Sequence, residues 1–178
     1  MSRQTKIMDE EAIARGLKRI THEIIERNNG ADNICILGVK KRGVPLAYRL
    51  AANIKLFEGV DVPVGVLDTR NFRDDISEAE KASYKNSSEI PFSIEDKTVI
   101  IVDDVLYTGR TARAAIEAVF YIARPRYLQL AVLIDRGHRE LPIRPDFVVK
   151  NIPTSKSELV MVKTKEFDNE NAVYICAE

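Results

Sequence analysis

The most restrictive feature of the sequence is an apolar run that leads directly into two adjacent carboxylates. Residues 98–102, Thr-Val-Ile-Ile-Val, have the composition of a strand buried on both faces, as in parallel sheets. Asp103 and Asp104 follow at once, and apolar residues then recur at helical spacing over residues 111–123. The apolar face of this helix is expected to hold Ala112, Ala115, Ile116, Val119 and Phe120. This order of strand, acids, turn and helix is typical of an α/β protein.

The rest of the chain continues the alternation of strands and helices. Helices are expected over residues 8–27 and 44–54, and strands over 34–39, 62–67, 127–134, 147–149, 159–162 and 173–176. We therefore predict a single domain over residues 1–178, with a central, mostly parallel sheet flanked by helices. Ligands of such sheets bind beyond the carboxyl ends of the strands, so the polar segments after residues 39, 67, 102 and 134 should converge.

A long polar segment interrupts this alternation before the strand at residues 98–102. Residues 68–97 are weakly periodic, and Arg70, Arg73, Asp74 and Asp75 lie near the start. A loop of this length in a compact domain is usually functional or disordered. We interpret the segment as a mobile, hairpin-like flap over the site.

The composition argues against several classes of protein. The chain has 27 Lys and Arg residues and 27 Asp and Glu residues, so its net charge does not favour general binding to nucleic acid or membranes. No apolar run approaches the roughly 20 residues of a membrane span. Two cysteines without a secretion signal predict neither a disulfide framework nor a zinc site, and Cys35 is expected to be a buried, reduced thiol. The expected compartment is the cytosol.

The segment after Asp104 has the chemistry of a binding site for a phosphorylated sugar. The first N–H groups of a helix are unpaired and attract anions, and Gly109 allows the backbone to approach a phosphate closely. Thr108 and Thr111 add hydroxyl donors, and Arg110 adds positive charge. We term residues 108–111 the phosphate turn.

Asp103 and Asp104 can accept hydrogen bonds from a vicinal diol or support Mg²⁺, but they repel a phosphate. A ribose 5-phosphate matches both parts of the segment, because its phosphate can bind to the phosphate turn and its hydroxyls can donate to Asp103 and Asp104. Solvated acids in an ordinary turn are the alternative, and the ordered combination of strand, acids, Thr-Gly and helix favours the binding site.

Two further polar segments follow expected strands. The basic loop, Lys40-Lys41-Arg42-Gly43, suits a pyrophosphate, and Val44-Pro45 replace the Lys and Ser/Thr that an ATP-binding P-loop requires. A dinucleotide site would require a third glycine that the loop lacks. The rim loop, residues 135–144, carries mixed donors for a nucleobase edge, and His138 has a supporting role at most.

Residues 103–111 resemble the phosphoribosyl-diphosphate signature of type I phosphoribosyltransferases. Together with residues 21–28, 135–144 and 150–158, they are similar to the family of bifunctional pyrimidine-operon attenuators and uracil phosphoribosyltransferases. The resemblance covers nearly the whole chain. It implies the type I phosphoribosyltransferase fold, with a flexible flap over about residues 68–97 and a small hood built from C-terminal and N-terminal segments.

The resemblance implies two activities. One converts uracil and phosphoribosyl diphosphate to UMP and pyrophosphate with Mg²⁺ and without an organic cofactor. The other is UMP-stimulated binding to a stem-loop in pyrimidine leader mRNA, which promotes transcription termination, and a homodimer or higher oligomer is also implied. A purine phosphoribosyltransferase without an RNA role, or a regulator that binds UMP without turnover, are the alternatives.

Roles for individual residues follow from the same resemblance. Asp103, Asp104 and Arg73 would be catalytic, with Mg²⁺ supported indirectly by the two aspartates. Phosphoribosyl diphosphate and UMP would be bound by Lys40, Lys41, Arg42, Gly43, Asp103, Asp104, Val105, Leu106, Tyr107, Thr108, Gly109, Arg110 and Thr111. The base would be addressed by Arg136 and by a hood near Val160. The flap departs from the family pattern, because Asp68-Thr69-Arg70-Asn71-Phe72 replaces a more usual Asp-Ile-Thr-x-Tyr.

The expected RNA surface is a local basic patch on a neutral protein. Its residues are Arg15, Lys18, Arg19 and His22 of the first helix together with Arg139, Arg144 and Lys150. Such side chains can contact RNA phosphates, and a stem-loop adds exposed bases. An ordinary solvated helix face is the alternative. Lys18 stands where the family often has Thr, which changes base readout there but not the attraction for phosphate.

Overall fold

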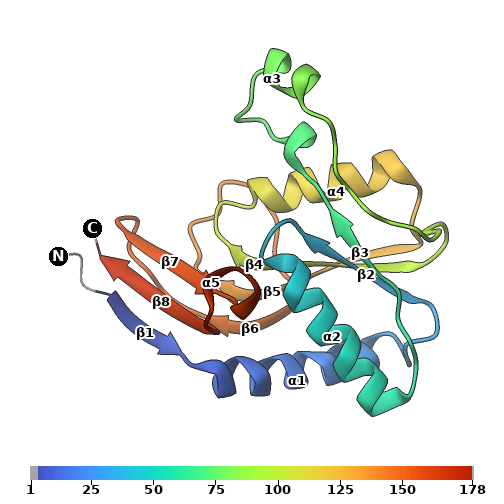
Figure 1. Cartoon of the computed structure of the whole chain (residues 1–178), viewed down its shortest axis with the longest axis horizontal. Helices are drawn as coiled ribbons and strands as arrows, with labels where there is room; N and C mark the ends of the chain where they lie inside the picture. The colour runs from blue at the N-terminus through green and yellow to red at the C-terminus, as the bar shows by residue number, and fades with distance from the viewer. Residues whose placement is uncertain (1–3, 178) are drawn as a thin grey trace.

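A five-stranded parallel sheet forms the centre of the computed structural model, which describes residues 4–177 (Figure 1). Its strand order is β3-β2-β4-β5-β6. The strands are β2 (Ile34–Val39), β3 (Val64–Leu67), β4 (Thr98–Leu106), β5 (Tyr127–Asp135) and β6 (Phe147–Asn151). The predicted α/β class and parallel sheet are therefore confirmed. β4 lies at the centre, with neighbours on both sides.

Helices cover both faces of this sheet (Figure 1). α1 (Glu10–Arg27) and α2 (Gly43–Glu58) pack on one face, and α4 (Arg110–Ile122) packs on the other. Each face of the sheet has its own hydrophobic core, and alternate strand residues belong to one or the other. Ile36 is part of the core under α1 and α2, and Leu37 is part of the core under α4. Burial on both faces explains why these strands are continuous apolar runs.

A second, antiparallel sheet is built from both ends of the chain. Its strands are β1 (Gln4–Met8), β7 (Glu158–Lys163) and β8 (Ala172–Ala177), in the order β1-β8-β7. The short helix α5 (Lys165–Asp168) joins β7 to β8. This unit, termed the hood, lies beside the main sheet at the left of Figure 1.

The flap projects away from the body at the top of Figure 1. It contains a 3₁₀ turn, η1 (Arg70–Phe72), and the short helix α3 (Glu78–Ser83), whose N-terminus is capped by Ser77. The returning chain forms an antiparallel bridge between Glu89 and Val66. The hairpin expected for residues 68–97 is thus reduced to one bridge, and the apolar side chains Phe72, Ile90, Phe92 and Ile94 pack on the core under α4.

Three expectations about individual elements are wrong. Met8 ends strand β1 instead of starting a helix, and Asp9 is the N-cap of α1, with its carboxylate accepting a hydrogen bond of 2.8 Å from the Ala12 amide. Phe120 is 56% exposed, because α4 packs on the sheet mainly through small alanines that allow close approach. β4 continues past Val102 to Leu106, so Asp103 and Asp104 lie within the strand rather than in a turn.

The expectation that Cys35 is a buried, reduced thiol is confirmed. Cys35 and Cys176 are free, buried thiols, and burial raises the pKa of Cys35 to about 11, which keeps it protonated. None of the helices within residues 4–177 is long and apolar enough to cross a membrane.

Candidate active site

The acid pair lies at the carboxyl edge of the central strand. Asp103 pairs with Val132 of β5, and this pairing continues to Leu106, whereas the pairing with β2 ends at Val102, so β5 fixes the backbone at the carboxylates. One Asp103 oxygen accepts a 2.9 Å hydrogen bond from the Asp104 amide, and one Asp104 oxygen accepts a bond of the same length from the Val105 amide. The two acids are thus placed by rigid sheet structure rather than by a loop.

The surroundings make both acids costly to ionise. Burial raises the pKa of Asp103 well above the usual carboxyl range, and the charge of Asp104 raises it further. Burial also raises the pKa of Asp104, against the opposing effects of a hydrogen bond with Asp103 and the positive charge of Arg42. Hydroxyl donors or a divalent cation would relieve this repulsion, so the pair suits a ribose diol and an associated Mg²⁺.

The phosphate turn encloses a small cavity next to Asp103. This cavity has a volume of about 280 Å³, and its lining runs from Asp103 and Val105 through residues 106–112, with Arg73 and Asp75 opposite. Gly109 has a φ of +91°, a conformation that L side chains rarely adopt, and α4 begins at the next residue. The unpaired amides at the start of α4 therefore face a cavity of suitable size for a phosphate.

The Arg110 side chain, which belongs to a residue that lines this cavity, bridges two other segments. Its Nε donates to a Glu140 oxygen of the rim loop at 2.6 Å, and its Nη1 donates to an Asp74 oxygen of the flap at 2.5 Å. Arg113, one turn further along α4, donates to the Phe72 carbonyl. These bonds connect the flap and the rim loop to the phosphate turn and the start of α4.

The glycines that flank the basic loop allow close packing of backbone. A Cβ on Gly43 would lie 2.3 Å from the Val102 carbonyl oxygen, and a Cβ on Gly38 would lie 2.5 Å from the Val44 Cα. Both distances are far below van der Waals contact. The glycines therefore bring the basic loop and the start of α2 against β4, immediately beside the acid pair.

The basic side chains of this loop have different environments. Lys40 and Lys41 are exposed, and the Lys40 ammonium donates to the Ser87 hydroxyl of the flap at 2.7 Å. Arg42 forms a two-pronged pair with Asp168 of the hood, at 3.1 and 2.8 Å. Asp168 was not found from the sequence, because a contact between residues 126 positions apart has no local pattern.

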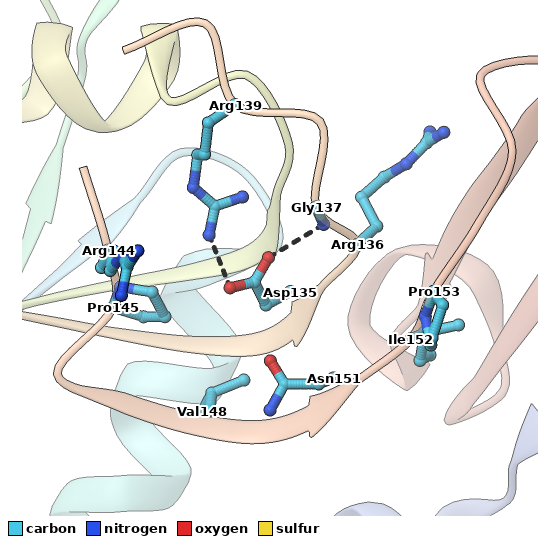
Figure 2. A pocket seen from close by; sticks show the side chains of 10 residues that line it. All are labelled: Asp135, Arg136, Gly137, Arg139, Arg144, Pro145, Val148, Asn151, Ile152 and Pro153. Atoms are coloured by element: carbon cyan, nitrogen blue, oxygen red, sulfur yellow. Dashed lines mark hydrogen bonds and ion pairs between the residues drawn. The ribbon is translucent and has the colours of Figure 1, made fainter. Parts of the chain in front are cut away.

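The rim loop is held by its own polar side chains. Arg139 donates to an Asp135 oxygen and to the Tyr107 and Ile143 carbonyls, so it has a structural role rather than a free basic surface (Figure 2). Arg136 is only 5% exposed and points away from Asp135 in Figure 2.

The Arg136 guanidinium instead connects the rim to the hood. It donates to Thr154 and to the Ser155 and Glu158 carbonyls, and it lies 4.0 Å from the centre of the Tyr107 ring. Val160 follows two residues after Glu158 on β7 and is half-buried against the main core. Arg136 and Val160, the two expected base-site residues, are therefore connected through β7. Most of the Arg136 donors are already bonded.

The expected RNA residues lie on α1, the rim loop and β6, and the His22 ring stacks on Phe57 of α2. Arg19 donates to the Val148 and Val149 carbonyls of β6 at 3.1 and 2.6 Å, which places α1 beside that strand. Lys18, His22, Arg144 and Lys150 are exposed. Near them, a cavity of about 490 Å³ is lined by the rim loop and β6, including Arg144 and Asn151 (Figure 2). Arg19 and Arg139 carry structural bonds in addition to any role in binding.

The described residues contain no group of three or more His, Cys, Asp or Glu side chains that could hold a metal by themselves. The adjacent carboxylates of Asp103 and Asp104 can share a divalent cation with a ligand that supplies further oxygens. This arrangement fits an ion that enters with a diphosphate-bearing substrate.

The parallel sheet, the acid pair and the phosphate turn define a type I phosphoribosyltransferase. A model of the phosphoribosyl transferase domain family matches residues 3–166. The bifunctional protein PyrR of Acetivibrio thermocellus is 56% identical over 172 residues, which cover 97% of this chain and 94% of that protein. The bifunctional protein PyrR of Clostridium beijerinckii is 54% identical over 175 residues, or 98% of each chain. The chain belongs to the PyrR family of phosphoribosyltransferases, as the sequence predicted.

Solved structures show the same fold at greater distance. The hypoxanthine phosphoribosyltransferase of Trypanosoma cruzi superimposes with a TM-score of 0.74 at 22% identity, covering 97% of this chain and 96% of that chain. A hypoxanthine-guanine phosphoribosyltransferase from Bacillus anthracis gives a TM-score of 0.72 at 20% identity, with 97% of each chain covered. The type I phosphoribosyltransferase fold is therefore confirmed.

The raised pKa of Asp103 leads to a prediction about stability. Between the ordinary carboxyl pKa of about 3.9 and the raised value, the folded state binds more protons than the unfolded state. The free energy of unfolding therefore falls as the pH rises through this window, because Asp103 has to ionise in its buried site. Asp103→Asn removes this cost of ionisation. We expect the variant to melt a few degrees higher at pH 7, since about 1 kcal/mol shifts the Tm of such a domain by roughly 2–4 °C.

Thermal unfolding between pH 3 and pH 8 measures this effect. The advantage of the variant should disappear below about pH 3.9, where both side chains are uncharged. A variant that melts at or below the wild-type temperature at pH 7 would show that the acid is not destabilising.

Proposed function

We propose that the chain transfers the phosphoribosyl group of phosphoribosyl diphosphate to uracil, and that it also attenuates pyrimidine genes by binding leader RNA when UMP is present. The observation that carries the first activity is the acid pair beside a phosphate-sized cavity at the start of α4. The extensive identity to PyrR proteins supports both activities.

Each part of the substrate has a matching group. The amides and hydroxyls of the phosphate turn bind the 5-phosphate, and Asp103 and Asp104 accept hydrogen bonds from the ribose hydroxyls. The basic loop and Arg73 bind the diphosphate, with Arg42 already aligned by Asp168. The base lies between the rim and the hood, near Arg136 and Val160.

The chemistry requires positioning and charge stabilisation more than a strong nucleophile. The bond between ribose C1 and the diphosphate oxygen breaks, N1 of uracil forms the new bond to C1, and the N1 proton is released. Positive charge develops on the ribose and favours the ionised form of Asp103 and Asp104, whose carboxylates then stabilise it electrostatically. Asp103 and Asp104 would hold Mg²⁺ together with the substrate, and the ion would supply positive charge that neutralises the diphosphate.

A panel of bases tests the enzymatic activity. We expect UMP and diphosphate to form from uracil and phosphoribosyl diphosphate with Mg²⁺, and the Asp103→Asn variant to lose at least about 100-fold in kcat/KM, because electrostatic stabilisation at such sites is worth several kcal/mol. Faster turnover of hypoxanthine or guanine would indicate a purine enzyme. UMP binding without turnover of any base would indicate a non-catalytic regulator.

The regulatory activity is supported by the basic patch that α1 and β6 form together. Lys18, Arg144 and Lys150 are exposed on neighbouring elements, and the adjoining cavity of about 490 Å³ is large enough for an unstacked base. A homodimer or higher oligomer would present this patch more than once, and the cytosol is the compartment in which leader RNA is met. Both are proposals that follow from the same regulatory activity.

A double variant that removes two positive charges tests whether RNA and substrate bind at separate sites. Lys18→Ala combined with Arg144→Ala should weaken binding of the pyrimidine leader stem-loop at least about tenfold, because two phosphate contacts are lost. Synthesis of UMP should stay within about twofold of the wild type, since neither side chain lines the phosphate cavity.

The matched control removes the same charge elsewhere. Lys85 and Arg126 are exposed on the flap and before β5, so Lys85→Ala with Arg126→Ala should leave RNA binding nearly unchanged. Equal weakening by the two double variants, measured by filter binding at one fixed salt concentration, would argue against a specific RNA surface.

A further inference from the structure

A basic cavity lies between the flap and the basic loop, and its charge exceeds what the expected site residues explain. Its volume is about 440 Å³, and it is lined by Lys40, Lys41, Asp68, Thr69, Arg70, Arg73, Ile76 and Tyr84. Four of these side chains are cationic and one is acidic. Arg73 also lines the cavity of the phosphate turn, so the two cavities adjoin through one side chain.

The cations of the site differ in whether a carboxylate already neutralises them. Arg73 pairs with Asp75, with its Nε 2.7 Å from a carboxylate oxygen, and Arg42 pairs with Asp168. Within residues 4–177, by contrast, no carboxylate lies at ion-pair distance from the Arg70 guanidinium or the Lys41 ammonium. The Lys40 ammonium also has no carboxylate partner among these residues, but it donates to the Ser87 hydroxyl at 2.7 Å. Arg70 and Lys41 are therefore the cations of the basic cavity that neither a carboxylate nor a flap hydroxyl engages.

Arg70 is held in place without using its charged donors. Asp68 accepts a hydrogen bond from the Arg70 backbone amide at 3.1 Å and another from the Tyr84 hydroxyl at 2.6 Å. Tyr84 is thereby fixed, and the Arg70 guanidinium stacks on its ring at 4.4 Å from the centroid. The amide and hydroxyl of Ser87 donate to the same Asp68 oxygen as the Tyr84 hydroxyl, Oδ2.

A stacked guanidinium keeps its N–H edge available. The Tyr84 ring contacts the face of the group, so the donors around its plane can still bind an anion in a bidentate manner. Asp68, the acidic side chain of the cavity, is occupied by flap donors and does not compete for them. An unneutralised and pre-oriented guanidinium beside lysines suits a ligand with several phosphate oxygens.

We propose that Arg70 binds the diphosphate group of phosphoribosyl diphosphate, and that with Lys41 it completes the diphosphate site from the flap side. This proposal rests on the proposed transferase function and deepens it. Arg70 occupies a position where the family pattern has Thr, so the contribution belongs to this chain. It is distinct from the acid pair, because it acts on the leaving group and leaves the ribose and 5-phosphate untouched.

The test compares two ligands that occupy different parts of the proposed phosphoribosyl diphosphate site. Magnesium diphosphate occupies the proposed subsite, whereas UMP carries the base, ribose and 5-phosphate but no diphosphate. We expect Arg70→Thr to raise the Kd of magnesium diphosphate about tenfold, as loss of a charge-assisted hydrogen bond predicts, and to leave the Kd of UMP within about twofold. Arg70→Lys, which keeps the charge but loses the fork, should give an intermediate Kd for diphosphate.

Lys85→Ala is the matched control, because it removes an exposed cation from the same flap without changing the lining of the cavity. It should change neither Kd by more than about twofold. A diphosphate Kd that is unaltered in Arg70→Thr, or raised equally in Lys85→Ala, would overturn the role of Arg70 while UMP binding still upholds the transferase site. A wild-type protein that binds neither ligand would overturn both.

Discussion

The arrangement of the site depends on two adjacent carboxylates at the edge of a buried strand. Asp103 and Asp104 repel each other, and burial makes each of them costly to ionise. The cost is tolerated because β4 is paired on both sides up to Val102 and with β5 beyond it, and helices cover both faces of the sheet. Pre-placed charge of this kind is what a developing positive ribose requires.

The positive charge of the site is organised in the opposite way, because most of it is neutralised by the protein itself. Asp168 neutralises Arg42, Asp75 neutralises Arg73, and Arg110 is shared between Asp74 and Glu140. These pairs join the hood, the flap and the rim loop to the groups that surround the acid pair. An anionic substrate would compete with the protein's own carboxylates, so each of these three segments is linked electrostatically to occupancy of the site.

The elements that the sequence predicted well are those whose signals are local. The apolar runs at β2 and β4 identify buried strands because both faces pack on helices, and the position of Gly109 before α4 identifies the turn. The acid pair was also evident, since a strand, two acids, Thr-Gly and a helix start follow one another in the order that a binding site for a phosphorylated sugar requires.

The features that the sequence did not reveal depend on distant partners. β1 forms only by pairing with β8 at the other end of the chain, so Met8 was assigned to a helix. β4 extends through Asp103 because β5 continues to pair with it, which local hydrophobicity does not record. The pairing of Arg42 with Asp168 and the stacking of Arg70 on Tyr84 likewise require the folded arrangement.

A crystal structure of the protein soaked with UMP tests the central claim most directly. The account predicts the 5-phosphate within hydrogen-bond distance of the amides of residues 108–111, with the ribose hydroxyls donating to Asp103 and Asp104. Nucleotide density elsewhere on the molecule, with the cavity beside Asp103 left empty, would contradict it.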